Sequence, residues 1–350
     1  MACSNCQSVL PKPNDWVKGK LVGTGSFGTV NLAMNKSTGG LFVVKSAHIG
    51  GGCEALSNEV KILESLSSSP YIVQYLGKEE DQGNLNVFME YMAGGSLADV
   101  AQKFGGSLDE DVVRLYTREI LHGLQHLHQH GIVHCDLKCK NVLLGSSGNI
   151  KLADFGCAKR VKDLKAAARL GGTPLWMAPE VLRNEQLDVS ADIWSLGCTV
   201  IEMATGRYPW AGEVSNPMAS VLRIANGDEI PQLPAHFSKE GLDFLTKCLE
   251  RDPKKRCTAQ DLLHHPFLSR SSRRSSQQKQ CVSSPTSVLE VHGFEDACDL
   301  DDELESSRGH DKLSIRNPFA CHDRAVGSKV CQPEDSALWS SGSWITVRSG

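Results

Sequence analysis

The sequence predicts an α+β fold of two lobes, in which a small β-rich lobe precedes a larger helical lobe and a mostly disordered C-terminal tail. In the first third, apolar and β-branched segments alternate with glycine-containing turns, and later segments carry apolar residues at helical spacing. After Leu268 the composition changes abruptly to Ser and Gln, followed by an acidic run at 295–307. So few apolar residues cannot offset the entropy lost on ordering a chain. We therefore divide the chain into an N-terminal extension (1–15), a folded region (16–268, with lobes of about 16–92 and 93–268) and a regulatory tail (269–350).

The first elements are expected to be three strands. The segments WVKGKLV (16–22), GTVNLAM (28–34) and GLFVVKSA (40–47) are rich in apolar and β-branched residues. Glycine-containing turns separate them. We expect these strands to be neighbours in one sheet.

Helices are expected from there on. Ser107-Leu108-Asp109-Glu110 has the form of a capping box and predicts a helix that begins at about residue 108. One apolar face of this helix follows from the spacing of Val113, Tyr116, Ile120, Leu124 and Leu127. The segment 191–206 is apolar nearly all round and stops at Gly206, which is typical of a helix buried inside a helical domain.

Composition and charge exclude several classes of protein. The formal net charge of −4 argues against a general nucleic-acid binder. Thirteen cysteines are scattered without small-domain spacing, and no secretory leader precedes them, so we expect reduced thiols rather than a disulfide framework. No apolar run approaches the roughly 18 residues of a membrane span. We expect a soluble cytoplasmic or nuclear protein with neither a membrane nor a nucleic acid as partner.

The glycine-rich segment GTGSFGTV (23–30) has the form G-x-G-x-x-G-x-V. Taken alone it indicates only a hairpin turn, but a strand follows it where a dinucleotide-binding fold would have a helix. Strand, glycine loop and strand together favour a loop that approaches ATP phosphates. Lys45 follows in the third strand, and its ammonium should face the nucleotide. Its partner should be a carboxylate on the next helix, with Glu59 the first candidate and Glu54 the alternative.

A second polar segment, HCDLKCKN (134–141), supplies the residue types that phosphoryl transfer needs. Asp136 is the candidate base for the hydroxyl proton, and Lys138 would steady the γ-phosphate as charge develops. Asn141 and Asp154 offer oxygen ligands for Mg²⁺. Each residue alone is an ordinary polar loop residue. Their order and spacing together indicate phosphoryl transfer from ATP.

These motifs resemble a complete eukaryotic serine/threonine protein kinase domain over residues 16–268. The matching segments are GTGSFGTV, FVVK, NEVKIL, HCDLKCKN, ADFG, GGTPLWMAPE and DIWSLG. Within that class, FVVKSA, YIVQYLG, MEYMAGGSL, IVHCDLK and ADFGCAK are similar to the plant MEKK-like MAP kinase kinase kinases. The resemblance implies the two-lobed protein kinase fold, ATP and Mg²⁺ as cofactors, and MAP kinase kinases as substrates in a signalling cascade. Upstream regulators and tail-binding proteins are further expected partners.

The resemblance also assigns residues to the nucleotide site. The ATP-binding set that it implies is Val22, Gly23, Gly25, Ser26, Phe27, Gly28, Val30, Val43, Lys45, Met89, Glu90, Met92, Ser96 and Leu143. In this set Met89 lies behind adenine, the hinge runs from Glu90 to Met92, and Ser96 stands where many kinases place an acidic residue on the ribose. Val43 departs from the usual alanine, and its extra methyl groups would crowd the base.

Further roles concern the support of the catalytic loop. The family uses a threonine, here Thr173, to contact Asp136 and Lys138. Glu180 would pair with a late arginine, here Arg256, and Asp192 on the buried helix would hold the backbone of the catalytic loop.

Cys135 stands where most such enzymes carry an arginine that gathers an activation-loop phosphate. Thr173 is the only hydroxyl side chain between Asp154 and Glu180, so this loop also lacks a free phosphorylation site. We therefore predict a kinase that is active without loop phosphorylation. The loop is basic instead, which indicates either a solvated charged loop or a docking site for an acidic surface; its cations are Lys159, Arg160, Lys162, Lys165 and Arg169.

Two alternatives to a protein kinase remain. Val43 and Cys135 leave open a pseudokinase or scaffold that binds cascade partners without efficient phosphotransfer, although Lys45, Asp136 and Asp154 are all retained. A small-molecule phosphotransferase of kinase-like fold is disfavoured by the segment GGTPLWMAPE.

Overall fold

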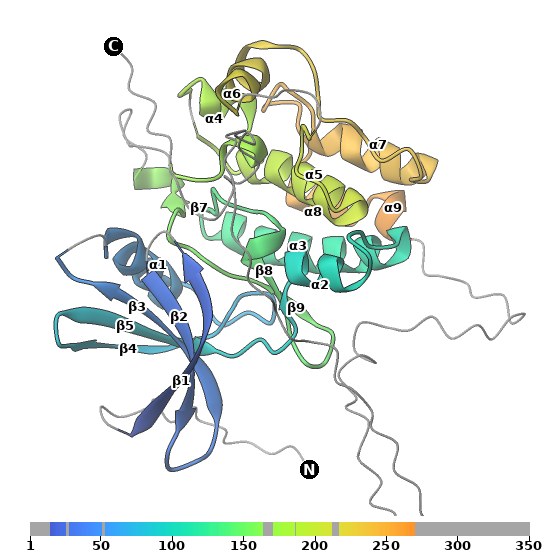
Figure 1. The fold of residues 1–350 in the computed structure, drawn as a ribbon. Helices are drawn as coiled ribbons and strands as arrows, with labels where there is room; N and C mark the ends of the chain where they lie inside the picture. Colours follow the sequence, from blue (N-terminus) through green and yellow to red (C-terminus); the bar gives the residue numbers. More distant parts are fainter. Residues whose placement is uncertain are drawn as a thin grey trace, which may run out of the picture. The chain divides into compact units, whose positions relative to one another are not determined.

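The computed structural model describes residues 15–25, 28–50, 53–163, 171–185, 187–211 and 217–269. All of them belong to the first of two compact units of the chain, Met1–Leu289. The second unit, Glu290–Gly350, and all of the predicted tail except Ser269 lie outside the described residues. Within the described residues the predicted two-lobed α+β fold is confirmed (Figure 1).

The first lobe is built on a five-stranded antiparallel sheet with the strand order β1-β2-β3-β5-β4. The bounds are β1 Trp16–Gly25, β2 Gly28–Asn35, β3 Leu41–His48, β4 Tyr75–Asp81 and β5 Asn84–Glu90. The first three strands are those expected from the sequence, and β4 and β5 were not predicted. Helix α1 (Glu54–Ser65) contacts β4 and β5.

The two faces of this sheet have different neighbours. Phe42 and Phe88 pack edge to face, with ring centroids 5.7 Å apart, in a small cluster that Trp16 joins. Side chains alternate between the faces of a strand, so Val43 and Lys45 point the other way from Phe42. Lys45 therefore lies on the face toward α1, where its charge can meet the helix.

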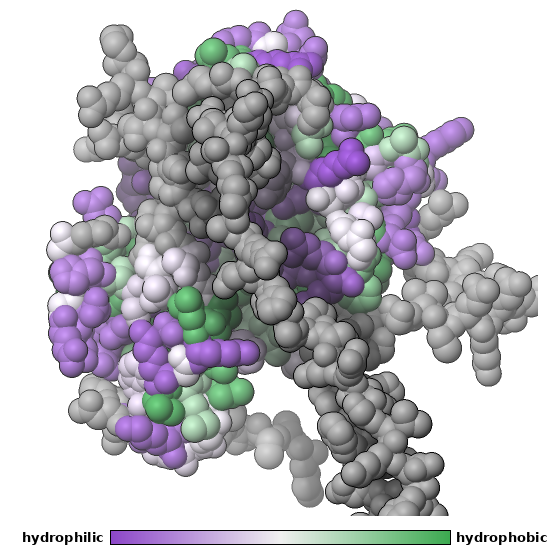
Figure 2. Space-filling model, viewed as in Figure 1, coloured by the Kyte–Doolittle hydropathy of each residue, from purple (hydrophilic) through white to green (hydrophobic). Residues whose placement is uncertain are grey.

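Apolar side chains also remain exposed on the first lobe. Val17 pairs in register with Met34, and Met34 pairs with Leu41, so these residues form a row across three strands. Each is more than two-fifths exposed. Figure 2 shows green apolar residues on the face of the lobe that carries β1 and β2.

The second lobe is helical. Its helices are α2 Leu97–Lys103, α3 Glu110–Gln129, α4 Pro179–Leu182, α5 Ser190–Thr205, α6 Pro217–Asn226, α7 Lys239–Cys248, α8 Ala259–Leu263 and α9 Pro266–Ser269. The apolar face predicted for α3 is buried at all five of its positions. Helix α5 is buried along almost its whole length and ends at Gly206, which has a left-handed backbone (φ 64°). Both predictions are confirmed.

Short strands and turns that were not predicted frame the predicted catalytic loop (134–141). Strand β7 (Ile132–Val133) pairs with β10 (Lys159–Arg160), and β6 (Gly95–Ser96) pairs with β8 (Val142–Leu144), which pairs with β9 (Ile150–Leu152). Single 3₁₀ turns cover Cys139–Asn141, Val161–Asp163 and Pro174–Trp176. Residues 134–138 thus lie between β7 and the first of these turns.

The predicted capping box is wrong. Helix α3 begins at Glu110 with Asp109 as its N-cap, and no side chain caps it. Leu108 N–H donates instead to the carbonyl of Met203 (2.8 Å), which ties this backbone to the end of α5 before the helix begins. Glu110 accepts from Ser238 N–H (2.8 Å) rather than reaching back to Ser107.

No helix within the described ranges is both long and apolar enough to cross a membrane.

Candidate active site

Lys45 lies in a cluster of charges between the lobes. Its Nζ is 2.7 Å from Glu59 Oε2 on α1 and 2.9 Å from Asp154 Oδ1, which follows β9. Glu59 is fully buried, and its second oxygen accepts from Phe155 N–H (3.2 Å). Glu54, the alternative partner, is exposed at the start of α1. The structure therefore pairs Lys45 with Glu59 and connects β3, α1 and the segment after β9.

The contacts within this cluster keep the Lys45 ammonium and the Asp154 carboxylate ionised. Burial lowers the pKa of the Lys45 ammonium, but the charges of Glu59 and Asp154 raise it by more, so its net pKa is raised. Burial raises the pKa of Asp154, but Lys45 outweighs this, and the net pKa is lowered. Lys45 is thus a fixed cation and Asp154 a fixed anion at neutral pH.

Asp192 of helix α5 supports the backbone of the predicted catalytic loop. Asp192 Oδ2 accepts from His134 N–H (2.8 Å) and Asp192 Oδ1 accepts from Cys135 N–H (3.0 Å). His128 Nε2 lies 2.9 Å from the same carboxylate. His134 Nε2 lies 3.1 Å from the carbonyl oxygen of Ala153, which precedes Asp154. These bonds fix the loop on α5 and join it to the segment that carries Asp154.

Asp136 is at the centre of a hydrogen-bonded group. Its Oδ1 accepts from Thr173 Oγ1 (2.6 Å), and its Oδ2 lies 3.0 Å from both Lys138 Nζ and Asn141 Nδ2. Lys138 Nζ donates to Thr173 Oγ1 (2.6 Å). The structure brings these four predicted residues together on two separate segments of the chain.

Two oxygens near Asp136 suit a hard cation. Asn141 uses its amide N–H groups for the backbone oxygen (2.7 Å) and the carboxylate of Asp136, which leaves its Oδ1 as an acceptor. Asp154 binds Lys45 through Oδ1, and its side chain is 36% exposed. Among the described residues no group of three or more His, Cys, Asp and Glu could hold a metal alone. Mg²⁺ needs only one or two carboxylates when phosphates complete its shell, so the residues present fit it.

The predicted adenine residues lie on both lobes. Val43 pairs in register with Met89, which is buried, and Met92 is buried after β5. Leu143 is half-buried on β8 in the second lobe. Glu90 Oε1 accepts from Lys151 Nζ (2.6 Å) and from Gln74 N–H (2.6 Å), which directs this carboxylate to β9 and β4.

The glycine-rich segment is described in part. Val22, Gly23 and Gly25 lie on β1 and Gly28 and Val30 on β2, whereas the predicted contacts Ser26 and Phe27 lie outside the described residues. Gly28 has a φ of 138°, and a Cβ there would lie 2.0 Å from the carbonyl oxygen of Ser46. This glycine is therefore required by the close approach of β2 to β3, whatever it contributes to phosphate binding.

Ser96 has a structural role that the sequence reading did not include. It is the N-cap of α2, and its hydroxyl donates to Asp99 Oδ2 (2.6 Å) and accepts from Asp99 N–H (3.2 Å). The acidic side chain at this corner of the site is thus Asp99. The spacing Ser-x-x-Asp is a capping pattern and could have identified this pair.

Sequence reasoning missed two further side chains that shape the site. Glu202 on α5 accepts from Trp176 Nε1 (3.0 Å) and from Cys139 N–H (3.1 Å). The amide of Asn58 on α1 donates to the carbonyls that follow Asp154, including Ala158 O (2.9 Å). Glu202 could have been identified because it is a charged residue inside the apolar stretch 191–206. The residues around Asn58 give no comparable indication.

Glu180 and Arg256 form the pair expected from the sequence. Arg256 Nη1 and Nη2 lie 2.7 and 3.0 Å from the two oxygens of Glu180, and both side chains are buried. Arg256 also stacks over Trp194, with its guanidinium carbon 5.4 Å from the ring centroid. The segment that begins α4 is thereby anchored to the core of the second lobe.

Cys135 has a left-handed backbone with a φ of 66°. Its thiol lies 3.5 Å from the carbonyl oxygen of Val133. Burial, followed by the nearby charge of Asp192, raises the pKa of this thiol, so it is neutral at physiological pH. It is neither a cation nor a reactive thiolate.

Comparison with known proteins gives one family. The family model described as "Protein kinase domain" matches residues 16–268. Three relatives in Arabidopsis thaliana are mitogen-activated protein kinase kinase kinases 2, 17 and 18, at 37, 39 and 42% identity over 98, 96 and 95% of this chain. The chain spans 56% of the first relative, 93% of the second and 99% of the third.

Proposed function

The chain belongs to the protein kinase family, and on this basis we propose that it is a serine/threonine kinase that phosphorylates MAP kinase kinases. The observation that carries the proposal is the group around Asp136, in which Thr173, Lys138 and Asn141 surround one carboxylate at hydrogen-bonding distance. A serine or threonine hydroxyl placed beside that carboxylate would lose its proton to it as the phosphoryl group arrives.

ATP and Mg²⁺ are the cofactors that the protein kinase family implies. Lys45, whose direction is set by Glu59, would bind the α- and β-phosphates. Asn141 and Asp154 would hold Mg²⁺, and Lys138 would supply positive charge for the γ-phosphate. Val43 of the first lobe and Leu143 of the second would hold the adenine ring, together with Met89 and the hinge at 90–92.

The substrate assignment is supported by the names and coverage of the relatives. Two of them match nearly their whole length to this chain and carry the name mitogen-activated protein kinase kinase kinase. We assign the protein to the cytoplasm or the nucleus, where upstream regulators and tail-binding proteins control it, and expect no membrane or nucleic-acid partner.

Activity without loop phosphorylation is part of the proposal. Cys135 has a partly buried, neutral thiol where a phosphate-binding arginine would stand, and Thr173 is already bonded to Asp136 and Lys138. A pseudokinase or scaffold is not favoured, because Lys45, Asp136 and Asp154 are retained and correctly grouped.

The proposal is tested with full-length protein expressed in bacteria and treated with phosphatase. Transfer from ATP and Mg²⁺ to a catalytically inactive MAP kinase kinase is measured for the wild type, Lys45→Met and Asp136→Asn. We expect transfer by the wild type and none by either variant, with all three proteins folded. Transfer by Asp136→Asn at the wild-type rate would contradict the assignment of the base, and failure of the wild type to bind ATP would favour the scaffold.

A further inference from the structure

Helix α1 contacts the segment that follows β9 through residues on one face of its first two turns. Residues three and four apart share a face of a helix, which places Ala55, Asn58 and Glu59 together. Glu59 Oε1 accepts from Phe155 N–H (3.2 Å). A Cβ added at Gly156 would lie 3.3 Å from the Cβ of Ala55, so the backbone of this segment runs close to the helix.

The Asn58 amide makes the third contact, with three backbone carbonyls. Its Nδ2 lies 2.9 Å from Ala158 O, 3.0 Å from Gly156 O and 3.3 Å from Phe155 O. Carbonyl oxygens only accept, so these three partners require a donor, and an amide nitrogen carries two hydrogens to share among them. A carboxylate or an aliphatic side chain at position 58 could not make these contacts.

Asp154, which directly precedes these carbonyls, has a backbone that needs support from its surroundings. Its φ is 63°, in the left-handed region that residues other than glycine rarely adopt. Such a conformation costs free energy and persists only when neighbouring groups impose it. Asn58 binds the carbonyls of Phe155 and Gly156, and Glu59 binds the N–H of Phe155. Helix α1 therefore holds the backbone directly after Asp154 through both a donor and an acceptor.

We propose that Asn58 is a positioning residue for Asp154, the Mg²⁺ ligand of the proposed function. Asn58 fixes the segment after Asp154 against α1, so that Asp154 Oδ1 stays 2.9 Å from Lys45 Nζ while Lys45 also contacts Glu59 on α1 (2.7 Å). Without the amide, the segment separates from α1 and the Asp154 carboxylate leaves this position. The inference rests on the proposed function in assigning Mg²⁺ and ATP to the site, whereas the support of Asp154 by α1 can be measured without either.

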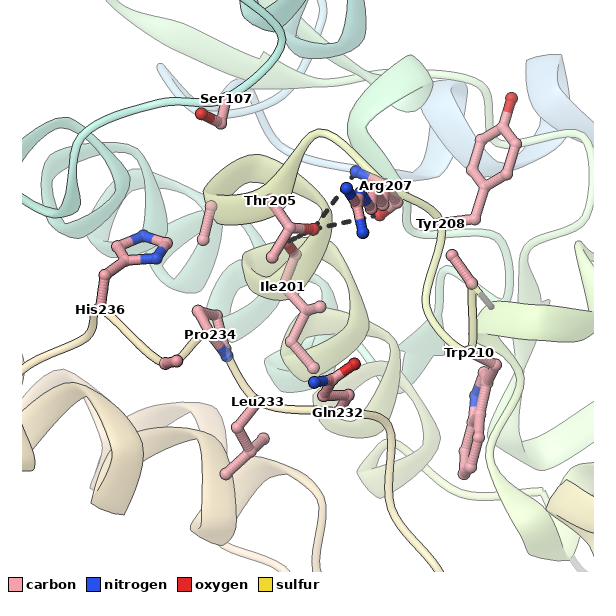
Figure 3. A pocket seen from close by; sticks show the side chains of 13 residues that line it. Ser107, Ile201, Thr205, Arg207, Tyr208, Trp210, Gln232, Leu233, Pro234 and His236 are labelled. Atoms are coloured by element: carbon pink, nitrogen blue, oxygen red, sulfur yellow. Dashed lines mark hydrogen bonds between the residues drawn. The ribbon is translucent and has the colours of Figure 1, made fainter. Parts of the chain in front are cut away.

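The test compares the full-length wild type with two substitutions of Asn58. Asn58→Leu keeps the approximate shape and removes the amide, and Asn58→Asp keeps the shape but only accepts. The matched control is Gln232→Leu, which removes an amide from an exposed side chain in the second lobe. Gln232 lines a pocket of about 340 Å³ between the end of α5 and the segment before α7 (Figure 3).

The first measurement is hydrogen–deuterium exchange of the nucleotide-free proteins, followed by mass spectrometry. Peptides that cover residues 54–65 and 154–158 should exchange at least about fivefold faster in both Asn58 variants, because the loss of one net hydrogen bond shifts a local opening equilibrium by about that factor. Gln232→Leu should leave these peptides at the wild-type rate. Wild-type exchange in both Asn58 variants would overturn the proposal.

The second measurement is calorimetric binding of two ligands, a non-hydrolysable ATP analogue with Mg²⁺ and adenosine without it. The analogue should bind at least about threefold more weakly to both Asn58 variants, because fewer molecules hold Asp154 in place, and adenosine should change by less than about twofold. Equal losses for the two ligands would indicate general damage to the site and overturn the positioning role. Unchanged binding of the analogue would overturn this role alone, whereas a wild type that binds neither ligand would overturn the proposed function together with it.

Discussion

The Thr173 hydroxyl connects the segment around residue 173 to Asp136, the proposed catalytic base, and Thr173→Val removes this hydroxyl while keeping the shape of the side chain. The wild-type hydroxyl donates to Asp136 and accepts from Lys138, both at 2.6 Å. Hydrogen bonds to charged groups contribute about 1.5–3 kcal/mol each. Asp136 and Lys138 still contact each other at 3.0 Å, so we count one such bond and not two. At 1.36 kcal/mol for each factor of ten, the expected loss in kcat/KM is about 10- to 150-fold.

The assay is steady-state transfer to an inactive MAP kinase kinase by phosphatase-treated enzyme. Thr173→Ser is the matched control, because it keeps the hydroxyl and should stay within about threefold of the wild type. ATP affinity should be unchanged in both variants, since Thr173 lies beside Asp136 and not among the predicted nucleotide contacts. Full activity of Thr173→Val would refute the role of this hydroxyl, and equal losses in Ser and Val would show that shape at Thr173 matters and the hydrogen bonds do not.

Two further predictions concern the support of the same loop. Gly172→Ala should lower both kcat and the melting temperature, because a Cβ at Gly172 would lie 2.5 Å from the backbone oxygen of Cys135. Gly105 also has a positive φ, of 86°, but a Cβ there meets nothing within 4 Å, so Gly105→Ala should change only stability. Burial raises the pKa of Glu202 above its ordinary value of 4.5, so its contribution to stability is fully present below pH 4.5 and is lost as the pH rises through the folded-state pKa. Denaturant unfolding at pH 5 and pH 8 should therefore show that Glu202→Gln is less destabilising, relative to the wild type, at pH 8. A pH-independent difference would contradict the raised pKa.

The sequence predicted those helices and strands whose own residues are mostly apolar or β-branched. Strands β2 and β3 are rich in β-branched and apolar residues, and helix α5 is apolar nearly all round, so their own sequences determine them. Strand β4 was not predicted, because its sequence YLGKEED is mostly polar and none of its side chains is buried. It forms through its pairing with β5 at the edge of the sheet. The start of α3 was misplaced because a backbone bond from Leu108 to Met203 overrides a local capping pattern.

The candidate site residues, whose roles remain predictions, could be chosen from the sequence where the proposed chemistry demands one side-chain type. A base, a γ-phosphate cation and oxygen ligands for Mg²⁺ leave little choice, so Asp136, Lys138, Asn141 and Asp154 stand out in the sequence. The supporting contacts could not be predicted in the same way. Glu202 meets Cys139 across 63 positions of the chain, and Asn58 meets Ala158 across 100. Such partners depend on how α1 and α5 pack, which no local pattern specifies.

The position of Cys135 shows why an arginine can be absent from this loop without loss of its geometry. A left-handed backbone at a residue other than glycine costs about 1–3 kcal/mol and persists only when its surroundings impose it. Here Asp192 accepts from the N–H groups of His134 and Cys135, and Gly172 packs against the carbonyl of Cys135. The backbone is therefore held by groups other than the side chain of residue 135. The side chain of residue 135 can therefore differ without moving the backbone that carries Asp136, and a cysteine there lacks the positive charge that would bind a phosphate.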